Sequence, residues 1–487
     1  MPAPILVLFR HDLRIADNGA LAAAAETGRP LVPVFVLDET SDGARPLGGA
    51  RRWWLHHSLA ALAKALKKLG APLVLRRGGV EAVVEDLLAD TGADAVHWNR
   101  RYDGPGRTVD ARLKAALRAK GIVAESFAGH LLHEPSQLRT KAGGPFKVFT
   151  PFWRALSAES EPRDPVDPPG RLFPLKPAPR SDDLEAWRLL PKAPDWAAGF
   201  AEHWTPGEAG AHEALDAFLD HGLAGYGARR DIPGVDGTSF LSPHLAHGEI
   251  TPVQIFAALI SRRPKAPPAD IEKFRQEIGW REFSWHLLYH RPALATDNFQ
   301  PAYDAFPWRD DANGLSCWQR GITGYPIVDA GMRQLWATGW MHNRVRMVVA
   351  SFLIKHLLVD WRQGEAWFWD TLVDADAGNN AASWQWVAGS GADAAPFFRI
   401  FNPVLQGEKF DSDGAYVRRF VPELAKLPDR FLHKPWTAPD AILFSAGVKL
   451  GETYPVPVVD HEAARARALG AYEAVRGHND GRTVQTG

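Results

Sequence analysis

Short apolar runs alternate with helical segments through the first 130 residues, and this alternation constrains the fold more than any other sequence feature. Strand–helix alternation predicts a parallel sheet covered by helices. The runs lack polar residues at alternate positions, which is typical of strands buried on both faces: Ile5–Phe9, Leu31–Leu37, Leu73–Leu75 and Ala95–Trp98. The helical segments are Ala20–Glu26, Trp53–Leu69, Val80–Ala89 and Ala111–Lys120. Arg10–Arg14 follows the first run in place of a glycine fingerprint, so Rossmann-type dinucleotide binding is not expected here.

The remaining chain predicts a proline-rich connector and a helical domain. A chain of 487 residues exceeds a single core. Prolines from Pro162 to Pro194 exclude long regular elements, although Phe149–Leu156 suits a short helix. We therefore expect an α/β domain at residues 1–130, a connector at 131–205 and an all-α domain at 206–487. The predicted helices of the last domain are Ala209–Gly222, Pro252–Ser261, Ala269–His290, Ile327–Thr338, Met341–Leu358, Glu365–Thr371 and Glu462–Val475.

Composition excludes several classes of protein. The net charge of −1 means that any nucleic acid must bind through a local basic patch. The single Cys317 excludes a disulfide framework and a thiolate metal site, and no Asp or His spacing suggests metal ligands. No apolar run is long enough for a membrane span, and the N-terminus lacks a signal pattern, so a cytoplasmic protein is expected.

The stretch from Asp374 to Phe401 is the strongest candidate site. It carries an Asn-Asn pair followed closely by Trp384 and Trp386. Asn and Asp favour turns and caps over helix interiors, and a buried Trp needs a partner for its N–H. These residues suit an ordinary core poorly. We therefore expect this stretch to form one wall of a pocket for a flat, polar-edged aromatic cofactor.

Three other clusters each admit a functional and a structural interpretation. The loop Asp236–His244, after Tyr226, has the hydroxyls and glycine of a phosphate-binding loop, but also of a simple capped turn. Two helical faces could line a cavity for an extruded base, or could be a surface ion pair and ordinary packing. The first face consists of Glu277, Trp280, Arg281 and Ser284, and the second of Trp340, Asn343, Arg344 and Met347.

Long motifs in the same order resemble DNA photolyases of the photolyase/cryptochrome family along nearly the whole chain. They are DGTSFLSPHLAHGEIT (236–251), GWREFSWHLL (279–288), GYPIVDAGMRQLWATGWMHNRVRM (324–347), DADAGNNAASWQW (374–386) and DAAPFFRIFNPVLQGEKFD (393–411). The resemblance implies an N-terminal Rossmann-like α/β domain with a parallel sheet, followed by a C-terminal helical domain that binds FAD. In subtype the chain is similar to bacterial cyclobutane pyrimidine dimer photolyases.

The resemblance also implies which residues contact FAD. Asn380 would face the reactive ring nitrogen of the flavin, and Phe240 stands where family members usually carry a basic residue. The implied FAD-binding residues are Tyr226, Thr238, Ser239, Phe240, Leu241, Ser242, Arg346, Asp374, Asp376 and Asn380.

The implied reaction is light-dependent repair of a dimer flipped out of damaged DNA, by electron transfer from excited reduced FAD. Glu277 would hydrogen-bond to the dimer, and Trp384, Trp361 and Trp308 match the family's photoreduction chain. Trp384 and Trp386 would point about 200° apart on a helix, so one can face the electron path and the other the lesion. The implied substrate or DNA contacts are Glu277, Trp280, Arg281, Asn343, Arg344, Met347, Trp386, Arg230, Arg399 and Gln406.

Single positions distinguish the subtypes. The (6-4) photolyases carry histidines at the positions of Asn343 and Met347, and plant signalling cryptochromes carry aspartate at that of Asn380. A blue-light-sensing cryptochrome that signals through protein partners is the alternative function, and a flavin oxidoreductase with a dissociable electron donor is a weaker third. The expected antenna chromophore is methenyltetrahydrofolate. A deazaflavin or no antenna stays open, because Asp103–Gly106 replaces the Asn-Glu pair that follows Tyr102 in one folate-binding branch. We expect a monomer.

Overall fold

A computed structural model describes residues 2–158, 162–393 and 398–483, with side chains described to residue 475. The chain forms two compact units. The first comprises Met1–Ala224, Ser239–Pro292 and Val373–Gly378, and the second comprises Gly225–Thr238, Ala293–Leu372 and Asn379–Gly487. The domain boundaries near residues 130 and 205 remain predictions.

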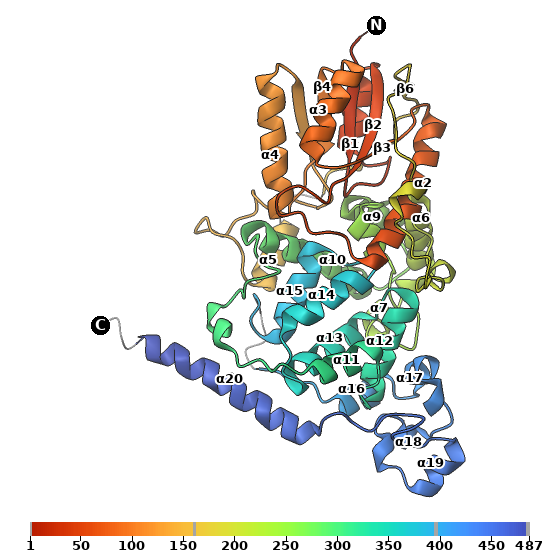
Figure 1. The fold of residues 1–487 in the computed structure, drawn as a ribbon, viewed down its shortest axis with the longest axis vertical. Coiled ribbons are helices and arrows are strands. Elements are labelled where there is room, and N and C mark those ends of the chain that lie inside the picture. Colours follow the sequence, from red (N-terminus) through yellow and green to blue (C-terminus); the bar gives the residue numbers. More distant parts are fainter. Residues whose placement is uncertain (1, 159–161, 394–397, 484–487) are drawn as a thin grey trace. The chain divides into compact units, whose positions relative to one another are not determined.

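A parallel sheet dominates the first unit, as the strand–helix alternation predicts (Figure 1). Its order is β3-β2-β1-β4-β5, and a short β6 pairs with β2. Every ladder is parallel. The strands are β1 (Ile5–Phe9), β2 (Pro30–Leu37), β3 (Val74–Arg77), β4 (Ala95–Asn99), β5 (Val123–Phe127) and β6 (Phe173–Pro174).

Both faces of the sheet are covered by helices. Ile5, Val7 and Phe9 belong to one apolar cluster with side chains of α1 and α2, while Leu6 and Leu8 belong to another with side chains of α3 and α4. Successive strand residues point to opposite faces, so an uninterrupted apolar run is required when both faces are buried. The helices of this unit are α1 (Gly19–Glu26), α2 (Gly49–Leu69), α3 (Val80–Thr91), α4 (Gly104–Ala119), α5 (Phe149–Ala158), α6 (Glu208–Ala217), α8 (Ser242–His247), α9 (Pro252–Arg262) and α10 (Pro268–His290).

Two details of the first unit differ from the sequence prediction. Strand β5 lies at the sheet edge and contains Glu125 and Ser126, so it lacks the apolar run by which the other strands were predicted. Helix α4 begins seven residues before the predicted Ala111, because the Asp103 side chain accepts a hydrogen bond from the Gly106 N–H at 2.7 Å and caps the helix.

The connector region contributes buried side chains to the first unit. Leu172 and Trp187 lie in the same apolar cluster as Ile5 and α2, and the Leu172 N–H donates to the Leu69 carbonyl at 2.8 Å. Trp204 packs edge-to-face against Trp54 of α2, with ring centroids 5.6 Å apart. These contacts attach the proline-rich segment to the sheet's helical layer.

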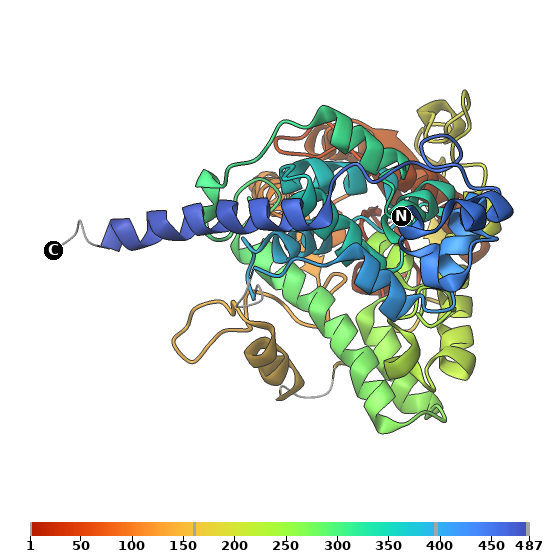
Figure 2. The same ribbon diagram turned by 90° about the horizontal axis from the view of Figure 1, so that it is seen from below.

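The second unit is helical, and α15 (Ala377–Ala388) begins in the last residues of the first. In Figure 2 the final helix, α20, is seen from the side, in blue. No helix in the described part of the chain is both long and apolar enough to cross a membrane. The other helices are α7 (Tyr226–Arg229), α11 (Ala312–Arg320), α12 (Pro326–Thr338), α13 (Asn343–Ser351), α14 (Trp361–Thr371), α16 (Pro403–Phe410), α17 (Ala415–Phe420), α18 (Asp429–Leu432), α19 (Asp440–Ala446) and α20 (His461–Thr483).

The predicted helix Met341–Leu358 is divided in the structure. His342 caps α13 by accepting a hydrogen bond from the Arg344 N–H at 3.2 Å, so Trp340 precedes the helix and does not share a helical face with Asn343. After Ser351 the backbone widens into a π-helical turn, η5 (Phe352–His356). Such turns occur often at functional sites, and a 3.6-residue periodicity does not predict them.

Candidate cofactor and DNA site

A buried charge cluster lies at the return of residues 373–378 to the first unit. Asp374 and Asp376 are each 7% exposed, and the Ser242 hydroxyl donates to Asp374 Oδ2 at 2.6 Å. Arg51 of α2 is 4% exposed. Burial lowers the pKa of Arg51 to about 10, although the charges of Asp376 and Asp374 raise it. The predicted flavin-binding acids therefore share a buried cation that the sequence did not reveal.

Aromatic and histidine side chains pack against the backbone that carries this cluster. The His247 ring hydrogen-bonds through Nε2 to the Val373 carbonyl at 3.2 Å and stacks on Trp54, with centroids 5.7 Å apart. The Trp54 indole N–H donates to Glu249 Oε1 at 2.9 Å. Burial and the Arg51 charge hold the pKa of His247 well below its usual range. A neutral His247 thus fixes the backbone that carries Asp374.

Replacing Arg51 by methionine should lower the free energy of unfolding by roughly 3–5 kcal/mol, because two buried acids lose their shared cation. Retention of FAD during purification should fall with it. Arg52→Met is the matched control, because the neighbouring Arg52 is more exposed and pairs with Glu39 instead. Urea unfolding and flavin absorbance measure the two effects. Equal losses in both variants would contradict this role of Arg51.

The loop after Gly237 has the backbone form of an anion-binding loop. Phe240 adopts φ +53°, and the following Leu241 is right-handed helical (φ −81°, ψ −9°). Successive left- and right-handed residues aim their N–H groups to one side, in a concavity that binds anions. Within the described residues, the buried Thr238 hydroxyl oxygen has no hydrogen-bond partner. Both observations fit the diphosphate of FAD. The Phe240 ring packs on Trp204, with centroids 6.2 Å apart, and so replaces the usual basic residue with an apolar contact.

Asn380 is fixed by Glu365 in the second unit. Its amide nitrogen donates to Glu365 Oε1 at 2.8 Å and to the Glu365 carbonyl at 3.0 Å, and Asn380 is 7% exposed. Both amide hydrogens therefore point toward Glu365. The amide oxygen faces the other way, where it can accept a hydrogen bond from a ligand N–H.

The predicted photoreduction tryptophans differ in burial. Trp384 and Trp361 are 2% and 0% exposed, whereas Trp308 is half-buried against Phe306. Helix α14 begins at Trp361 and supplies Phe368, whose ring meets Trp384 edge-to-face at 5.0 Å. The Trp361 indole donates to Asn298 Oδ1 at 3.0 Å, while the buried Trp384 N–H has no partner among the described residues. Buried and half-buried members suit a path that ends near the surface.

Helix α15 separates its two tryptophans, as its helical period predicts. Trp384 packs on Phe368 and Trp318. Trp386 is half-buried and lines a small cavity of the second unit that Trp384 does not line. Of the stretch Asp374–Phe401, residues 394–397 lie outside the described residues.

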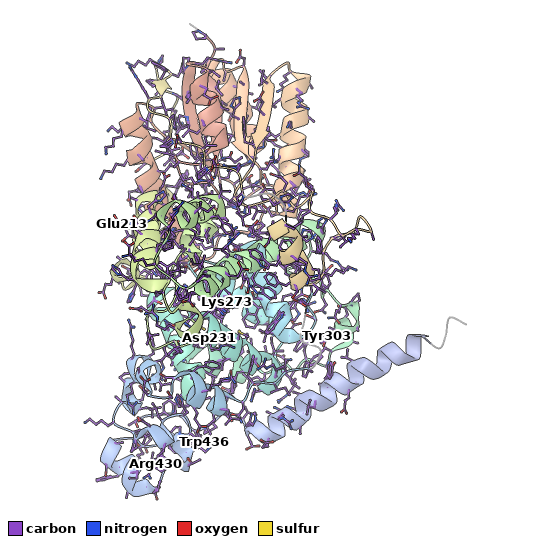
Figure 3. The ribbon with its side chains drawn as sticks, turned by 180° about the vertical axis from the view of Figure 1, so that it is seen from behind. Glu213, Asp231, Lys273, Tyr303, Arg430 and Trp436 are labelled. Atoms are coloured by element: carbon purple, nitrogen blue, oxygen red, sulfur yellow. The ribbon has the colours of Figure 1, made fainter. Side chains whose placement is uncertain are left out.

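The predicted substrate face of α10 has an accessible and a buried half. Phe149 stacks on Trp280 with centroids 3.7 Å apart. Glu277 pairs at 3.0 Å with Lys273, which is labelled in Figure 3. Arg281 is 7% exposed, and its guanidinium donates to the His130 carbonyl at 3.1 Å and to Glu282. These bonds favour a structural role for Arg281 over a DNA contact.

Two predicted DNA-contacting arginines share one acid. Asp231, labelled in Figure 3, lies 3.0 Å from the Arg344 guanidinium and 3.7 Å from that of Arg230. The ring of Phe410 lies 4.5 Å from the Arg344 guanidinium carbon, and the Met347 sulfur lies 3.8 Å from Arg344 Nη1. Asp231 thus pairs with both cations and offsets part of their charge.

The other predicted residues of the second unit have simpler surroundings. Tyr226 is 5% exposed and opens α7, and Arg346 Nε donates to the Met341 carbonyl at 2.7 Å. Asn343 and Arg399 are exposed, and Gln406 is half-buried on α16. Exposed polar side chains of this kind are suited to DNA contacts.

In the first unit, Tyr102 and Asp103 are both engaged by the protein itself. The Tyr102 hydroxyl donates to Glu134 at 2.8 Å and accepts from the Gly129 N–H at 3.0 Å, while Asp103 caps α4. An antenna pigment would therefore have to use other side chains.

A curated protein named deoxyribodipyrimidine photo-lyase, from Agrobacterium fabrum, is 59% identical to this chain over 474 residues and spans 97% of this chain and 98% of that protein. The chain belongs to the DNA photolyase family. Two sequence models of the family match it: "DNA photolyase" over residues 5–170 and "FAD binding domain of DNA photolyase" over residues 274–474. The family predicted from the motifs is confirmed.

Solved structures confirm the predicted two-part fold of this photolyase family member. A bacterial class III photolyase from Agrobacterium tumefaciens matches with a TM-score of 0.95 at 58% identity, covering 98% of each chain. Cryptochrome-1 of Arabidopsis thaliana is 39% identical and covers 95% of this chain but 69% of that protein. The relatives thus include photo-lyases and a cryptochrome, and the identity to the photo-lyase is the higher.

Proposed function

We propose that this protein is a deoxyribodipyrimidine photo-lyase that repairs cyclobutane pyrimidine dimers in DNA under light. The observation that carries the proposal is the 59% identity to the Agrobacterium fabrum photo-lyase across nearly the full length of both chains. When bound and reduced, FAD supplies the electron that opens the dimer and then recovers it. The roles of the protein's own side chains follow from their surroundings.

The proposed cofactor-binding residues supply backbone N–H groups, buried charges and an oriented amide oxygen. The loop through Phe240 would present N–H groups to the diphosphate, and the buried Arg51 supplies a positive charge to Asp374 and Asp376. Asn380 would accept a hydrogen bond from a flavin ring N–H through its amide oxygen, because its nitrogen is committed to Glu365.

The substrate-binding residues would recognise a dimer that has left the duplex. A damaged base pair costs less to unstack than an intact one, which gives selectivity before any contact forms. Phe149 covers one face of the Trp280 ring, and we assign the other face to stacking on the dimer. Trp386 would supply a second stacking surface, and Glu277 a hydrogen bond to the dimer. Asn343 and Met347 would line the same site.

A repair assay with a dark control tests this function. Purified, photoreduced protein is incubated with an oligonucleotide that contains a thymine dimer, under blue light and in darkness. Restored thymines in the light alone are expected. If the flavin is present and no thymine is restored, the proposal fails and a sensory role, as in cryptochromes, becomes the better interpretation.

Neutralising Asp231 should strengthen DNA binding. Asp231→Asn removes the carboxylate charge that offsets part of the charge of Arg230 and Arg344, so both guanidinium groups should attract phosphates more strongly. We expect roughly two- to tenfold tighter binding of undamaged duplex at low salt, and a steeper dependence on salt. Fluorescence anisotropy at several salt concentrations measures both. Glu452→Gln, which removes the same charge from a surface pair with Lys449, should change neither. Weaker binding by Asp231→Asn would show instead that Asp231 is needed to position the arginines.

The antenna, assembly and location are separate parts of the proposal. We assign methenyltetrahydrofolate as the antenna, with a deazaflavin as the other candidate, and expect a monomer in the cytoplasm. Extraction of the pigment and its absorption spectrum identify the antenna. Gel filtration with light scattering measures the mass in solution.

A further inference from the structure

A small cavity in the second unit is lined by aromatic and apolar side chains together with Lys355 and Arg399. Its volume is about 30 Å³, and its walls include Tyr303, Lys355, Trp386, Arg399 and Tyr472. A cavity needs roughly 10–15 Å³ of such volume to admit one water molecule, so this one has room for a small ion. Among the described residues that line it, two are cations, two carry phenolic hydroxyls and none is acidic.

Lys355 is the buried charge of this cavity. It lies on the π-helical turn η5 and is 1% exposed. Its ammonium nitrogen is 3.3 Å from the centre of the Phe398 ring, and within the described residues it has no hydrogen bond or ion pair. A buried lysine in such surroundings is costly unless it is neutral or paired with an opposite charge.

Tyr303 and Tyr472, which line the same cavity as Lys355, are each packed against neighbouring groups. Phe398 stacks on Tyr472 of α20, with centroids 4.6 Å apart. Tyr303, on the 3-10 turn η4 (Pro301–Ala305) and labelled in Figure 3, has its hydroxyl oxygen over Gly389. A Cβ at residue 389 would lie 2.9 Å from that oxygen, and Gly389 has φ +91°, so a side chain is excluded there.

We propose that this cavity binds one small monovalent anion of halide size, held by the Lys355 ammonium group with the hydroxyls of Tyr303 and Tyr472 as donors. The exposed Arg399, which is also a proposed DNA contact, adds a second positive charge to the lining. All of these groups can donate a hydrogen bond to an anion, and the edges of aromatic rings also carry partial positive charge. A halide is close in size to the water that the volume admits. Bulky anions are excluded by the same volume.

Anion binding must then depend on pH. Burial lowers the pKa of Lys355 to about 7, whereas burial and Tyr472 raise the pKa of Tyr303 to about 12. The other titratable residues that line the cavity are Tyr472 and Arg399, whose guanidinium carbon lies 4.9 Å from the Phe401 ring. Because only protonated Lys355 pairs with an anion, halide affinity should fall roughly a hundredfold between pH 6 and pH 9.

The test uses the full-length, FAD-containing protein and bromide. Thermal unfolding is followed against bromide at constant ionic strength, with gluconate as the balancing anion that is too large for the cavity. A saturable rise in Tm at pH 6, absent at pH 9, is expected. Lys355→Met retains the apolar length of the side chain and should abolish the rise. Lys449→Met, which removes a surface cation paired with Glu452, should retain it.

Diffraction from crystals soaked in bromide locates the ion independently of stability. An anomalous peak beside Lys355, lost in Lys355→Met, is the expected result. No peak there, or an equal bromide response in Lys355→Met, would overturn the proposal. Lys355→Met could also lower the slope of DNA affinity against salt concentration by about one ion. That result, together with a lost bromide effect, would overturn the proposal in favour of a DNA phosphate contact. Since no step requires light or a dimer, a failed repair assay leaves this result unaffected.

Discussion

Trp384→Phe should slow the light-driven reduction of oxidised FAD by roughly tenfold or more, equivalent to at least ~1.4 kcal/mol in the barrier. Trp384 is buried against Phe368 and close to Gly364, where a Cβ would lie 2.1 Å from the indole. Phenylalanine fits that space but is far harder to oxidise than tryptophan. The path from Trp308 and Trp361 would then lack its last member.

Repair by the chemically reduced protein should be almost unchanged in the same variant, because repair does not draw on the tryptophan path. Flash photolysis measures photoreduction, and the thymine-dimer assay measures repair. Trp98→Phe is the control, since Trp98 is a buried tryptophan of the sheet core. Parallel losses of photoreduction and repair would place Trp384 in the substrate or flavin site instead. Normal photoreduction would mean that electrons enter by another route.

Local periodicity predicted the elements that bury a continuous stripe or run. Strands β1 and β4 and helices α1, α9 and α10 lie within one residue of their predicted starts. Side-chain caps from Asn18 and Thr251 determine the starts of α1 and α9. Strand β5 was missed because only one of its residues is buried. The turn η5 was missed because a π-helical widening leaves no trace in a 3.6-residue pattern.

The candidate site was predictable where a motif is contiguous, and not where partners come from distant segments. Asp374 and Asp376 stand out in the sequence, whereas Arg51 lies among ordinary residues of an amphipathic helix and gains meaning only from the acids it meets. The left-handed backbone of Phe240 is similar: nothing about a phenylalanine predicts φ +53°. Tertiary packing imposes both features.

Asn380→Asp should destabilise the protein at neutral pH by about 1–3 kcal/mol. In Asn380 an amide nitrogen donates to Glu365 Oε1 at 2.8 Å. The substitution replaces it with a carboxyl oxygen, which cannot donate a hydrogen bond once it is ionised. Asn380 and Glu365 are 7% and 3% exposed, so solvent screens the two carboxylates little. Burial and the neighbouring acid should therefore raise the pKa of the new Asp in the folded state.

The sign of the pH dependence follows from that shift. The unfolded chain releases the Asp proton near pH 4, while the folded variant holds it to higher pH. Between these two pKa values the folded state binds more protons, so the free energy of unfolding falls as pH rises, and the loss is complete above the folded pKa. Urea unfolding at pH 5, 6, 7 and 8 should show this slope relative to the unsubstituted protein.

A second substitution separates charge repulsion from a general loss of fit. Glu365→Gln in the Asn380→Asp background restores a donor opposite the new acid, so it should recover most of the stability and remove the added pH slope. Asn379→Asp makes the same chemical change one residue away, at a half-buried position, and should show a smaller slope. If Asn380→Asp has no added slope, Asn380 does not depend on Glu365 for its orientation. The amide oxygen could then not be assigned to the flavin on this ground.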